Sequence, residues 1–281
     1  IANLSNPLNI IVGNPNLSPS VDRNVYLNYD NYNWQDRTGL FMYLSLRFQS
    51  DMVSPVTETD ENLLRTTTYT NVDGNYNYYG GMGYSKEIKK DSAYTIKFNI
   101  RPYFNLQKNV GFTNGARLEA KRNSFSPRIS TTFNYRELIE IEPMYTISLN
   151  NTKYNIDSFE DITFTSHNAE LKTTTYWPKS VIWGKDIRYN YNGNVGTGFD
   201  KDAIFWNMSL GVELFKKKAT FKLLAYDLLN QNINTRRSTG QDFIQDFQGT
   251  VLRRYFMMSL TFKFDQFGGA KSRKGGRFFS M

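Results

Sequence analysis

Few residues in this sequence are of the types that catalyse reactions or hold a metal ion. The chain of 281 residues contains a single histidine, His167, and no cysteine. Zinc fingers, cysteine nucleophiles and disulfide frameworks are therefore excluded, since each needs residues that are missing here. A metal site of carboxylates alone has no spacing of Asp and Glu to support it. We expect no metal and no cofactor, and we expect His167 at the edge of a long loop as an ordinary surface residue.

Glu140 and Glu142 are a pair of carboxylates whose types suit general acid–base chemistry. They occur in the segment ELIEIE, which we expect to be a turn between strands, and no nucleophile, base or oxyanion donor forms a site around them. The glycines of YNGNVGTG lie between two expected strands, so they lack the strand-to-helix context of a phosphate-binding loop. The sequence therefore predicts that the protein is not an enzyme and has no catalytic residues.

The composition favours strands. Aromatic residues make up 16% of the chain, and Asn and Thr are plentiful. Aromatic and β-branched side chains suit a pleated surface, so an all-β fold is expected. The formal charge of +8 is compatible with anionic partners, either nucleic acid or the head groups of lipid and lipopolysaccharide, and does not choose among them.

The hydrophobicity of the sequence has a period of two, which predicts where its strands lie. In WNMSLGVEL, residues 206–214, every second residue is large and apolar, and the residues between are Asn, Ser, Gly and Glu. After the short basic turn KKK the alternation resumes with Phe221, Leu223 and Ala225. Alternation of this kind is typical of a strand with one apolar and one polar face. The two arms form a hairpin that is apolar along one whole side.

Segments of the same kind recur along the chain, joined alternately by five short turns and five long loops. Outer-membrane barrels have this organisation, with short periplasmic turns, long extracellular loops and strands of about 9 to 11 residues. A soluble β-sandwich is the alternative, although its strands average about five or six residues. The eleven expected strands are at 23–33, 40–48, 66–85, 94–103, 128–136, 144–150, 168–177, 181–191, 206–214, 220–225 and 251–264.

The odd number of strands is informative, because bacterial single-chain barrels have an even number. Eleven is half of the 22 strands of the plugged outer-membrane transporters. We therefore expect an all-β, antiparallel transmembrane β-barrel. Residues 1–265 would be the C-terminal half of a 22-stranded barrel, and residues 266–281 a basic Gly/Lys/Arg tail. The first residues show no signal segment, which predicts that the chain is part of a longer product.

Three segments resemble the TonB-dependent receptors of the bacterial outer membrane. NPNLSPSVDRNVYLNY, residues 14–29, is similar to that family's Asn-Pro-x-Leu-x-Pro element before a descending strand. YDLLNQN, residues 226–232, resembles the element that ends a late ascending strand, and VLRRYFMMSLTFKFDQFGG resembles the terminal strand. The chain is most similar to the plug-bearing barrels common in Bacteroidota, which often carry a tail such as GGAKSRKGGRFF.

This resemblance implies uptake of a ligand across the outer membrane, through a plug domain that the energised TonB complex remodels. The implied partners are outer-membrane lipid, the plug and N-terminal strands of the same product, the TonB complex, and outer-membrane lipoprotein or other subunits. No nucleic acid is implied. A structural or scaffolding barrel subunit of an outer-membrane complex is the second hypothesis. A soluble basic β-protein that binds polyanions is the third.

Inward-facing polar residues could contact a plug or line a path, although a hydrated or plugged interior requires polar residues in any case. Ligand-binding residues are unknown; loops that could hold them include TETDEN and TRRSTGQD. The inward-facing polar residues are Lys97, Arg101, Asn207, Glu213 and Lys222.

Four tryptophans near expected strand ends fit interfacial girdles, or alternatively packing against a neighbouring protein. They are Trp34, Trp177, Trp183 and Trp206. The tail from Lys271 to Arg277 could contact anionic inner-leaflet lipid, peptidoglycan or a partner, or it could be a flexible periplasmic end. Either Phe264 or Phe279 would serve as the terminal aromatic that assists assembly in many barrels.

Overall fold

The computed structural model describes residues 9–61, 64–90, 93–232, 235–239, 244–249 and 251–263. Its regular structure is all β, as predicted. No helix in these ranges is long and apolar enough to cross a membrane. The strands are β1 Asn9–Ile11, β2 Val21–Asn33, β3 Thr38–Ser50, β4 Met52–Thr59, β5 Arg65–Val72, β6 Asn75–Lys90, β7 Tyr94–Arg101, β8 Tyr103–Thr113, β9 Ala116–Phe125, β10 Arg128–Tyr135, β11 Ile139–Tyr154, β12 Ile162–Thr175, β13 Val181–Asn192, β14 Asp202–Leu214, β15 Ala219–Tyr226, β16 Thr235–Thr239, β17 Ile244–Gln248 and β18 Tyr255–Phe262.

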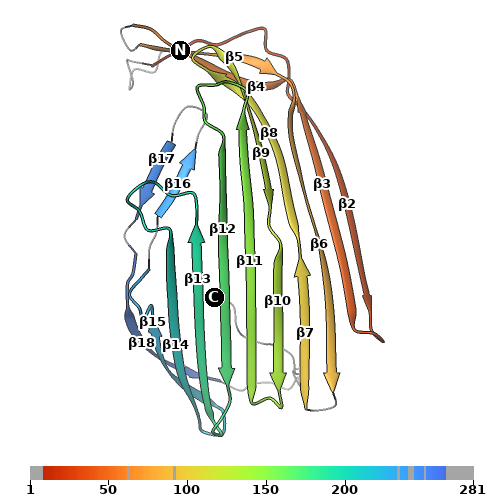
Figure 1. The fold of residues 1–281 in the computed structure, drawn as a ribbon, viewed down its shortest axis with the longest axis vertical. Helices are drawn as coiled ribbons and strands as arrows, with labels where there is room; N and C mark the ends of the chain where they lie inside the picture. Colours follow the sequence, from red (N-terminus) through yellow and green to blue (C-terminus); the bar gives the residue numbers. More distant parts are fainter. Residues whose placement is uncertain are drawn as a thin grey trace.

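Thirteen of the strands form one large antiparallel sheet (Figure 1). β7 and β8 both pair with β6, one after the other along its length, and β9 and β10 pair with β11 in the same way. The thirteen strands therefore occupy eleven positions across the sheet. From one edge to the other the order is β2, β3, β6, β7 with β8, β10 with β9, β11, β12, β13, β14, β15 and β18.

Two positions across the sheet are each occupied by two successive strands, and a proline separates the two strands in each case. Pro102 separates β7 from β8, and Pro127 separates β9 from β10. Proline has no N–H to donate to a neighbouring strand, so the ladder is interrupted where it occurs. The chain stays paired at this level because the backbone N–H groups of Tyr103 and Ser126 donate to each other's carbonyl oxygens, at 3.2 and 2.8 Å.

The residues between the expected strands 94–103 and 128–136, which include the segment NVGFTNGARLEAKRN, were expected to form one of the long loops, and that expectation is wrong. β8 and β9 run through these residues and meet at the tight turn Asn114–Gly115, where both residues have positive φ. The alternation of apolar and polar residues stops here because Lys108 and Lys121 take the place of apolar side chains on one face. A search for period-two hydrophobicity therefore loses these strands.

The expected strand 66–85 is also wrong, because the chain turns within it at Asp73–Gly74, where Gly74 has a φ of 94°. β5 precedes the turn and β6 follows it. β5 belongs to a separate three-stranded sheet with β1 and β4, and β4 occupies the expected loop DMVSPVTETDEN. The expected loop before the last strand likewise holds the hairpin β16–β17. The last expected strand began at residue 251, whereas β18 begins at Tyr255.

The expected strands 144–150 and 168–177 are parts of longer ones. β11 begins at Ile139, so Glu140 and Glu142 lie within a strand and the turn before it is shorter than predicted. β12 begins at Ile162, so His167 lies inside a strand instead of at a loop edge. The β12 extension has Thr163, Thr165 and His167 on the face that is apolar elsewhere, so the period of two in hydrophobicity is absent there. The β11 extension does alternate, as Ile139, Glu140, Ile141 and Glu142, and its assignment to a turn was wrong.

The short turns lie together at one end of the large sheet, the lower end in Figure 1, and the small sheets lie toward the other end. In the turn KKK, Phe215, Lys216 and Lys217 have positive φ, and the N–H of Lys218 donates to the carbonyl of Phe215 at 3.2 Å. This tight turn is as predicted. We call the two ends the short-turn end and the loop end.

The two faces of the large sheet differ in polarity, as the alternation predicts. Leu210 lies between Trp183 and Leu223 on one face, which we call the apolar face, whereas its neighbour Ser209 lies on the opposite, polar face. Phe256 and Met258, on the apolar face of β18, are 72% and 73% exposed. A continuous exposed apolar surface of this extent is suited to lipid and is rare on soluble proteins.

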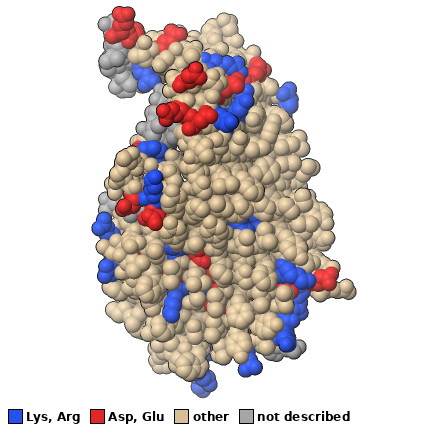
Figure 2. All heavy atoms as spheres, in the orientation of Figure 1, with Lys and Arg blue, Asp and Glu red and all other residues tan. Residues whose placement is uncertain are grey.

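The charged side chains are distributed unevenly along the length of the strands. Figure 2 shows Lys, Arg, Asp and Glu gathered most densely near the upper end, with scattered charged residues below and a largely uncharged area on the right side at mid-height. The best-buried apolar side chains, Val110 and Leu118, lie in β8 and β9 near the loop end. The sheet therefore has a small core under its loops.

Candidate functional site: a polar pocket near the loop end

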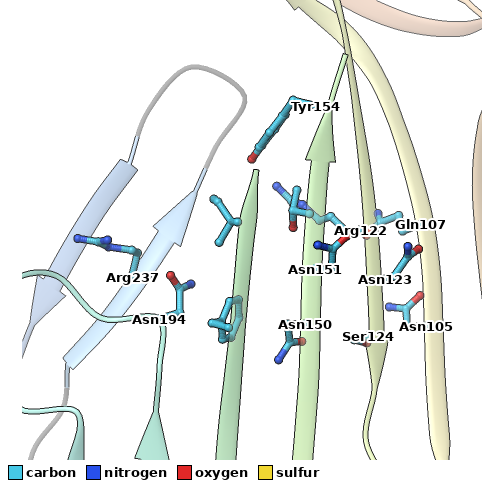
Figure 3. A pocket seen from close by; sticks show the side chains of 13 residues that line it. Asn105, Gln107, Arg122, Asn123, Ser124, Asn150, Asn151, Tyr154, Asn194 and Arg237 are labelled. Carbon is cyan, nitrogen blue, oxygen red and sulfur yellow. The ribbon is translucent and has the colours of Figure 1, made fainter. Parts of the chain in front are cut away.

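A pocket of about 360 Å³ opens on the polar face near the loop end (Figure 3). Its lining is rich in amide and hydroxyl groups. The lining residues are the amides Asn105, Gln107, Asn123, Asn150, Asn151 and Asn194, the hydroxyl residues Ser124, Thr152 and Tyr154, the cations Arg122 and Arg237, and the apolar residues Ile162 and Phe164.

The strand register brings most of this lining together. Ser124 of β9 lies between Asn105 of β8 and Asn150 of β11, and Arg122 lies two residues further along β9 in the next row. Residues two apart in a strand point to the same face, so the rows combine into one polar surface. The strand pairing, and not the spacing of these residues in the sequence, therefore decides which side chains are neighbours in this wall of the pocket.

A loop and a hairpin close the pocket from the other side. Figure 3 shows Asn194 and Arg237 across the pocket from Asn105 and Gln107. Asn194 follows β13, and Arg237 belongs to β16. A Cβ added to Gly196 would lie 2.7 Å from the Nη2 atom of Arg237, so glycine at this position allows the loop to approach the hairpin.

Two groups in the pocket have unused hydrogen-bonding capacity. Among the described residues, the Oδ1 atom of Asn105 and the hydroxyl of Tyr154 are buried without a partner. Leaving such a group unsatisfied costs about 1 to 3 kcal/mol, so water or a ligand is expected to satisfy it. Amides offer donors and acceptors together. The pocket can therefore bind a molecule that carries several hydroxyl or amide groups.

The charged groups of the pocket do not form a catalytic arrangement. The guanidinium of Arg237 donates two hydrogen bonds to Asp246, which neutralises its charge. Within the described ranges, no group of His, Asp and Glu could hold a metal ion. The chemistry that the pocket supports is recognition of a polar molecule.

The five inward-facing residues expected from the sequence do lie on the polar face, but none of them lines the pocket. The side chain of Asn207 accepts a hydrogen bond from the backbone N–H of Asp227 at 2.9 Å. The guanidinium of Arg101 stacks over the ring of Phe41 at 5.5 Å. Glu213 pairs with Lys217 in the short turn at 3.4 Å. Lys97 lies opposite Glu87, and Lys222 opposite Gly211.

A charged network on the polar face was missed by sequence reasoning. Arg188 donates to Glu170 at 2.6 Å and to Asp186 at 2.9 Å, and Lys172 lies 3.1 Å from Glu170. Two cations and two carboxylates balance one another. The residues come from β12 and β13, and only their pairing shows that they are neighbours.

His167 also has a different environment from the expected one. It lies on the apolar face between Ile147 and Tyr191, and its Nδ1 atom is 2.6 Å from the hydroxyl of Tyr145. The ring of Tyr191 lies 5.6 Å from the imidazole. His167 is therefore part of an aromatic cluster on the face directed toward lipid.

Three of the four tryptophans lie at the short-turn end, where an interfacial girdle would place them. Trp34 and Trp177 are exposed beside short turns, and Trp183 is near the start of β13. Trp206 was also expected near a strand end, but it lies well inside β14, opposite Ile187. The tail from Lys271 to Arg277, Phe264 and Phe279 lie outside the described residues.

The segment YDLLNQN has a clear structural role at the loop end. The carboxylate of Asp227 accepts hydrogen bonds from the backbone N–H groups of Gln231 and Asn232, at 2.9 and 3.0 Å. The side chain of Asn232 donates to the carbonyl of Leu252 at 2.8 Å. This segment ends β15, and the hydrogen bond from Asn232 to Leu252 links the beginning of the connection between β15 and β18 to a residue near its end.

The long antiparallel strands, the exposed apolar face and the polar opposite face define a membrane β-sheet of the barrel class. In agreement, residues 1–142 and 119–262 match the outer membrane protein beta-barrel family. The chain belongs to this family, which places it in the bacterial outer membrane. No curated protein and no solved structure matches the chain. Family membership decides against the soluble sandwich and the soluble polyanion-binding protein.

Proposed function

We propose that this chain is the C-terminal half of a 22-stranded transporter of the TonB-dependent receptor type, and that its polar pocket captures a ligand from outside the cell. The two edges of the sheet carry the proposal. Within the described ranges β2 pairs only with β3, and β18 only with β15. Unpaired strand edges are not tolerated in lipid, so further strands must cover both.

The direction of the edge strands supports a large barrel. Eleven antiparallel positions make β2 and β18 run in the same direction, so they cannot pair antiparallel with one another. Antiparallel closure needs an odd number of additional strands between them. Eleven more, supplied by the N-terminal part of the same product, would complete the 22 strands of the plugged transporters.

The pocket favours ligand capture over a purely structural role. It lies near the loop end, on the polar face that would line the barrel, and the Asn105 Oδ1 atom and the Tyr154 hydroxyl in it have no hydrogen-bond partner among the described residues. A scaffold needs polar residues in its lumen but gains nothing from buried groups without partners. The TonB complex and the plug are the partners that this proposal requires, and an outer-membrane lipoprotein is a further candidate.

Uptake by cells that express the complete gene product tests the proposal. The probes are fluorescently labelled oligosaccharides, peptides and siderophores. Accumulation of one class that requires the gene product, and that a protonophore abolishes, is the expected result. Asn105→Ala should reduce it, whereas Asn134→Ala, on the polar face of β10 outside the pocket, should not. A folded product that accumulates no probe and co-purifies stoichiometrically with other subunits would favour the scaffolding hypothesis and overturn this one.

A further inference from the structure

A row of three lysines crosses neighbouring strands on the apolar face. Lys121 of β9 is directly opposite Lys108 of β8 on one side and Lys153 of β11 on the other. Four residues along each strand, in the direction of the short turns, lie Phe104 on β8, Phe125 on β9 and Leu149 on β11, which also pair with one another. A separation of four residues keeps the side chains on one face. The lysines and these apolar residues therefore share a surface.

The lysine row is only partly neutralised. Glu119 pairs with Lys108 at 2.8 Å and with Arg117 at 3.3 Å, so one carboxylate serves two cations. Lys121 and Lys153 are exposed, and neither forms an ion pair within the described part of the chain. Like charges directly opposite one another destabilise a sheet. An anion bound across the row would remove this repulsion.

The surface changes polarity in steps from the lysine row toward the short turns. The next row by register holds Leu106, Asn123 and Asn151, of which the two asparagines also line the polar pocket, and the row after it is the apolar one. Cation, amide and hydrocarbon thus follow one another. A lipid with an anionic head group, a polar linkage and acyl chains has the complementary order.

An apolar groove of about 590 Å³ begins at this apolar row. Pro102 and Gly81 of β6 are among its lining residues. A Cβ on Gly80 would lie 3.0 Å from the ring of Phe104, so glycine lets that ring lie flat against the sheet. Residues that line the groove include Leu27, Met42, Leu44, Met82, Phe104 and Phe125.

The spacing between the lysine row and the groove suits one molecule. Phe104 and Lys108 are four residues apart, which corresponds to about 13 Å at about 3.3 Å per residue. An acyl chain in the groove can therefore belong to the same lipid whose anionic group contacts the lysines. The row lies toward the loop end, which faces the cell exterior in outer-membrane barrels.

We propose that Lys108, Lys121 and Lys153 bind the phosphate groups of an outer-leaflet lipopolysaccharide, with one of its acyl chains in the groove. This inference concerns the lipid surface of the barrel and does not depend on transport. The occupant is a phosphorylated glycolipid because the exterior leaflet of this membrane is where such lipids lie and where the lysine row is placed.

Binding of fluorescent lipid A to the complete gene product in phosphatidylcholine nanodiscs tests the proposal. Replacing the three lysines by asparagine should weaken binding by on the order of 10- to 100-fold, because each basic residue near an anionic surface contributes to attraction. The matched control replaces Lys216, Lys217 and Lys218 by asparagine, which removes the same charge at the short-turn end. Heat-dependent migration in gels verifies that each variant is folded.

Three outcomes would overturn the proposal. Equal weakening by both triple variants would show that only net charge matters. Equal affinity of the unaltered protein for phosphatidylglycerol and lipid A would show that the lysine row binds any anionic lipid. Unchanged lipid A binding after loss of the three lysines would show that the row is not the site. Selective loss with the row variant alone, together with preference for lipid A, supports it.

Discussion

Arg237 of β16 and Asp246 of β17 face each other in register and share two hydrogen bonds, from Nε to Oδ1 and from Nη2 to Oδ2, each 2.7 Å long. The hydrogen bond from Arg237 holds the pKa of the Asp246 carboxyl below its ordinary value. Because the folded-state pKa is lowered, the contribution of this pair is complete above the carboxyl's ordinary pKa and is lost as pH falls through the lowered value.

The hairpin β16–β17 should therefore be less protected in acid than at neutral pH. Hydrogen exchange of peptides from this hairpin, corrected for the intrinsic effect of pH on exchange, measures the opening. Asp246→Asn should remove the pH dependence and leave the hairpin less protected at neutral pH. An identical pH profile in the variant would show that the pair does not govern the hairpin.

The direction of side chains on β14 gives a second prediction. Leu210→Arg places a charge on the apolar face near mid-strand and should cost about 2 to 4 kcal/mol, as charges at the membrane midplane of barrels do. Ser209→Arg directs the same charge to the polar face and should cost much less. Refolding into lipid vesicles under a denaturant titration measures both, and equal tolerance would contradict the assignment of the two faces.

A third prediction concerns Gly83, which lies opposite Phe41. The ring of Phe41 occupies the space that a Cβ at position 83 would need, and Arg101 stacks on that ring. Gly83→Ala should cost about 1 to 3 kcal/mol through overpacking. In a Phe41→Ala background the same change should cost less, and a double-mutant cycle by denaturant unfolding measures the difference. Equal costs in both backgrounds would rule out the ring as the cause.

The charged network on β12 and β13 gives a fourth prediction. Glu170→Gln should cost about 1 to 3 kcal/mol, because the carboxylate is largely buried and pairs with both Arg188 and Lys172. Glu213→Gln is the control, since its partner Lys217 is exposed and such pairs contribute about 0 to 1 kcal/mol. Denaturant unfolding should show a larger loss of free energy of unfolding for Glu170→Gln than for Glu213→Gln. A larger loss for Glu213→Gln would contradict the role given to the network.

The strands that could be predicted from the sequence are those whose apolar face meets lipid along their length. In β14 the residues from Trp206 to Leu214 alternate without interruption, and the predicted end at Leu214 coincides with the observed one. β8 and β9 were missed where Lys108 and Lys121 replace apolar residues. The period of two in hydrophobicity therefore predicts a strand only along the part of its length that contacts lipid. Where the strand extends beyond the lipid, the period is lost.

The pocket could not be predicted because its residues become neighbours only through strand pairing and loop closure. Asn105 and Asn194 are far apart in the sequence, and both are ordinary polar residues when considered singly. The lysine row has the same origin, since the register of β8, β9 and β11 decides which lysines meet. Sequence spacing gave the facing of Asn207 and Lys222 but not their distance from a binding site.

Pro102 and Pro127 lie at one height in adjacent positions of the sheet, where each removes a backbone donor. The N–H groups of Met82 and Ile147 still donate to the carbonyls of the two prolines, so the neighbouring strands continue across this level. The wall is thus weakened along a short horizontal line without being cut. β6 on one side and β11 on the other are paired both above and below this height, so the two parts of the sheet remain one continuous surface.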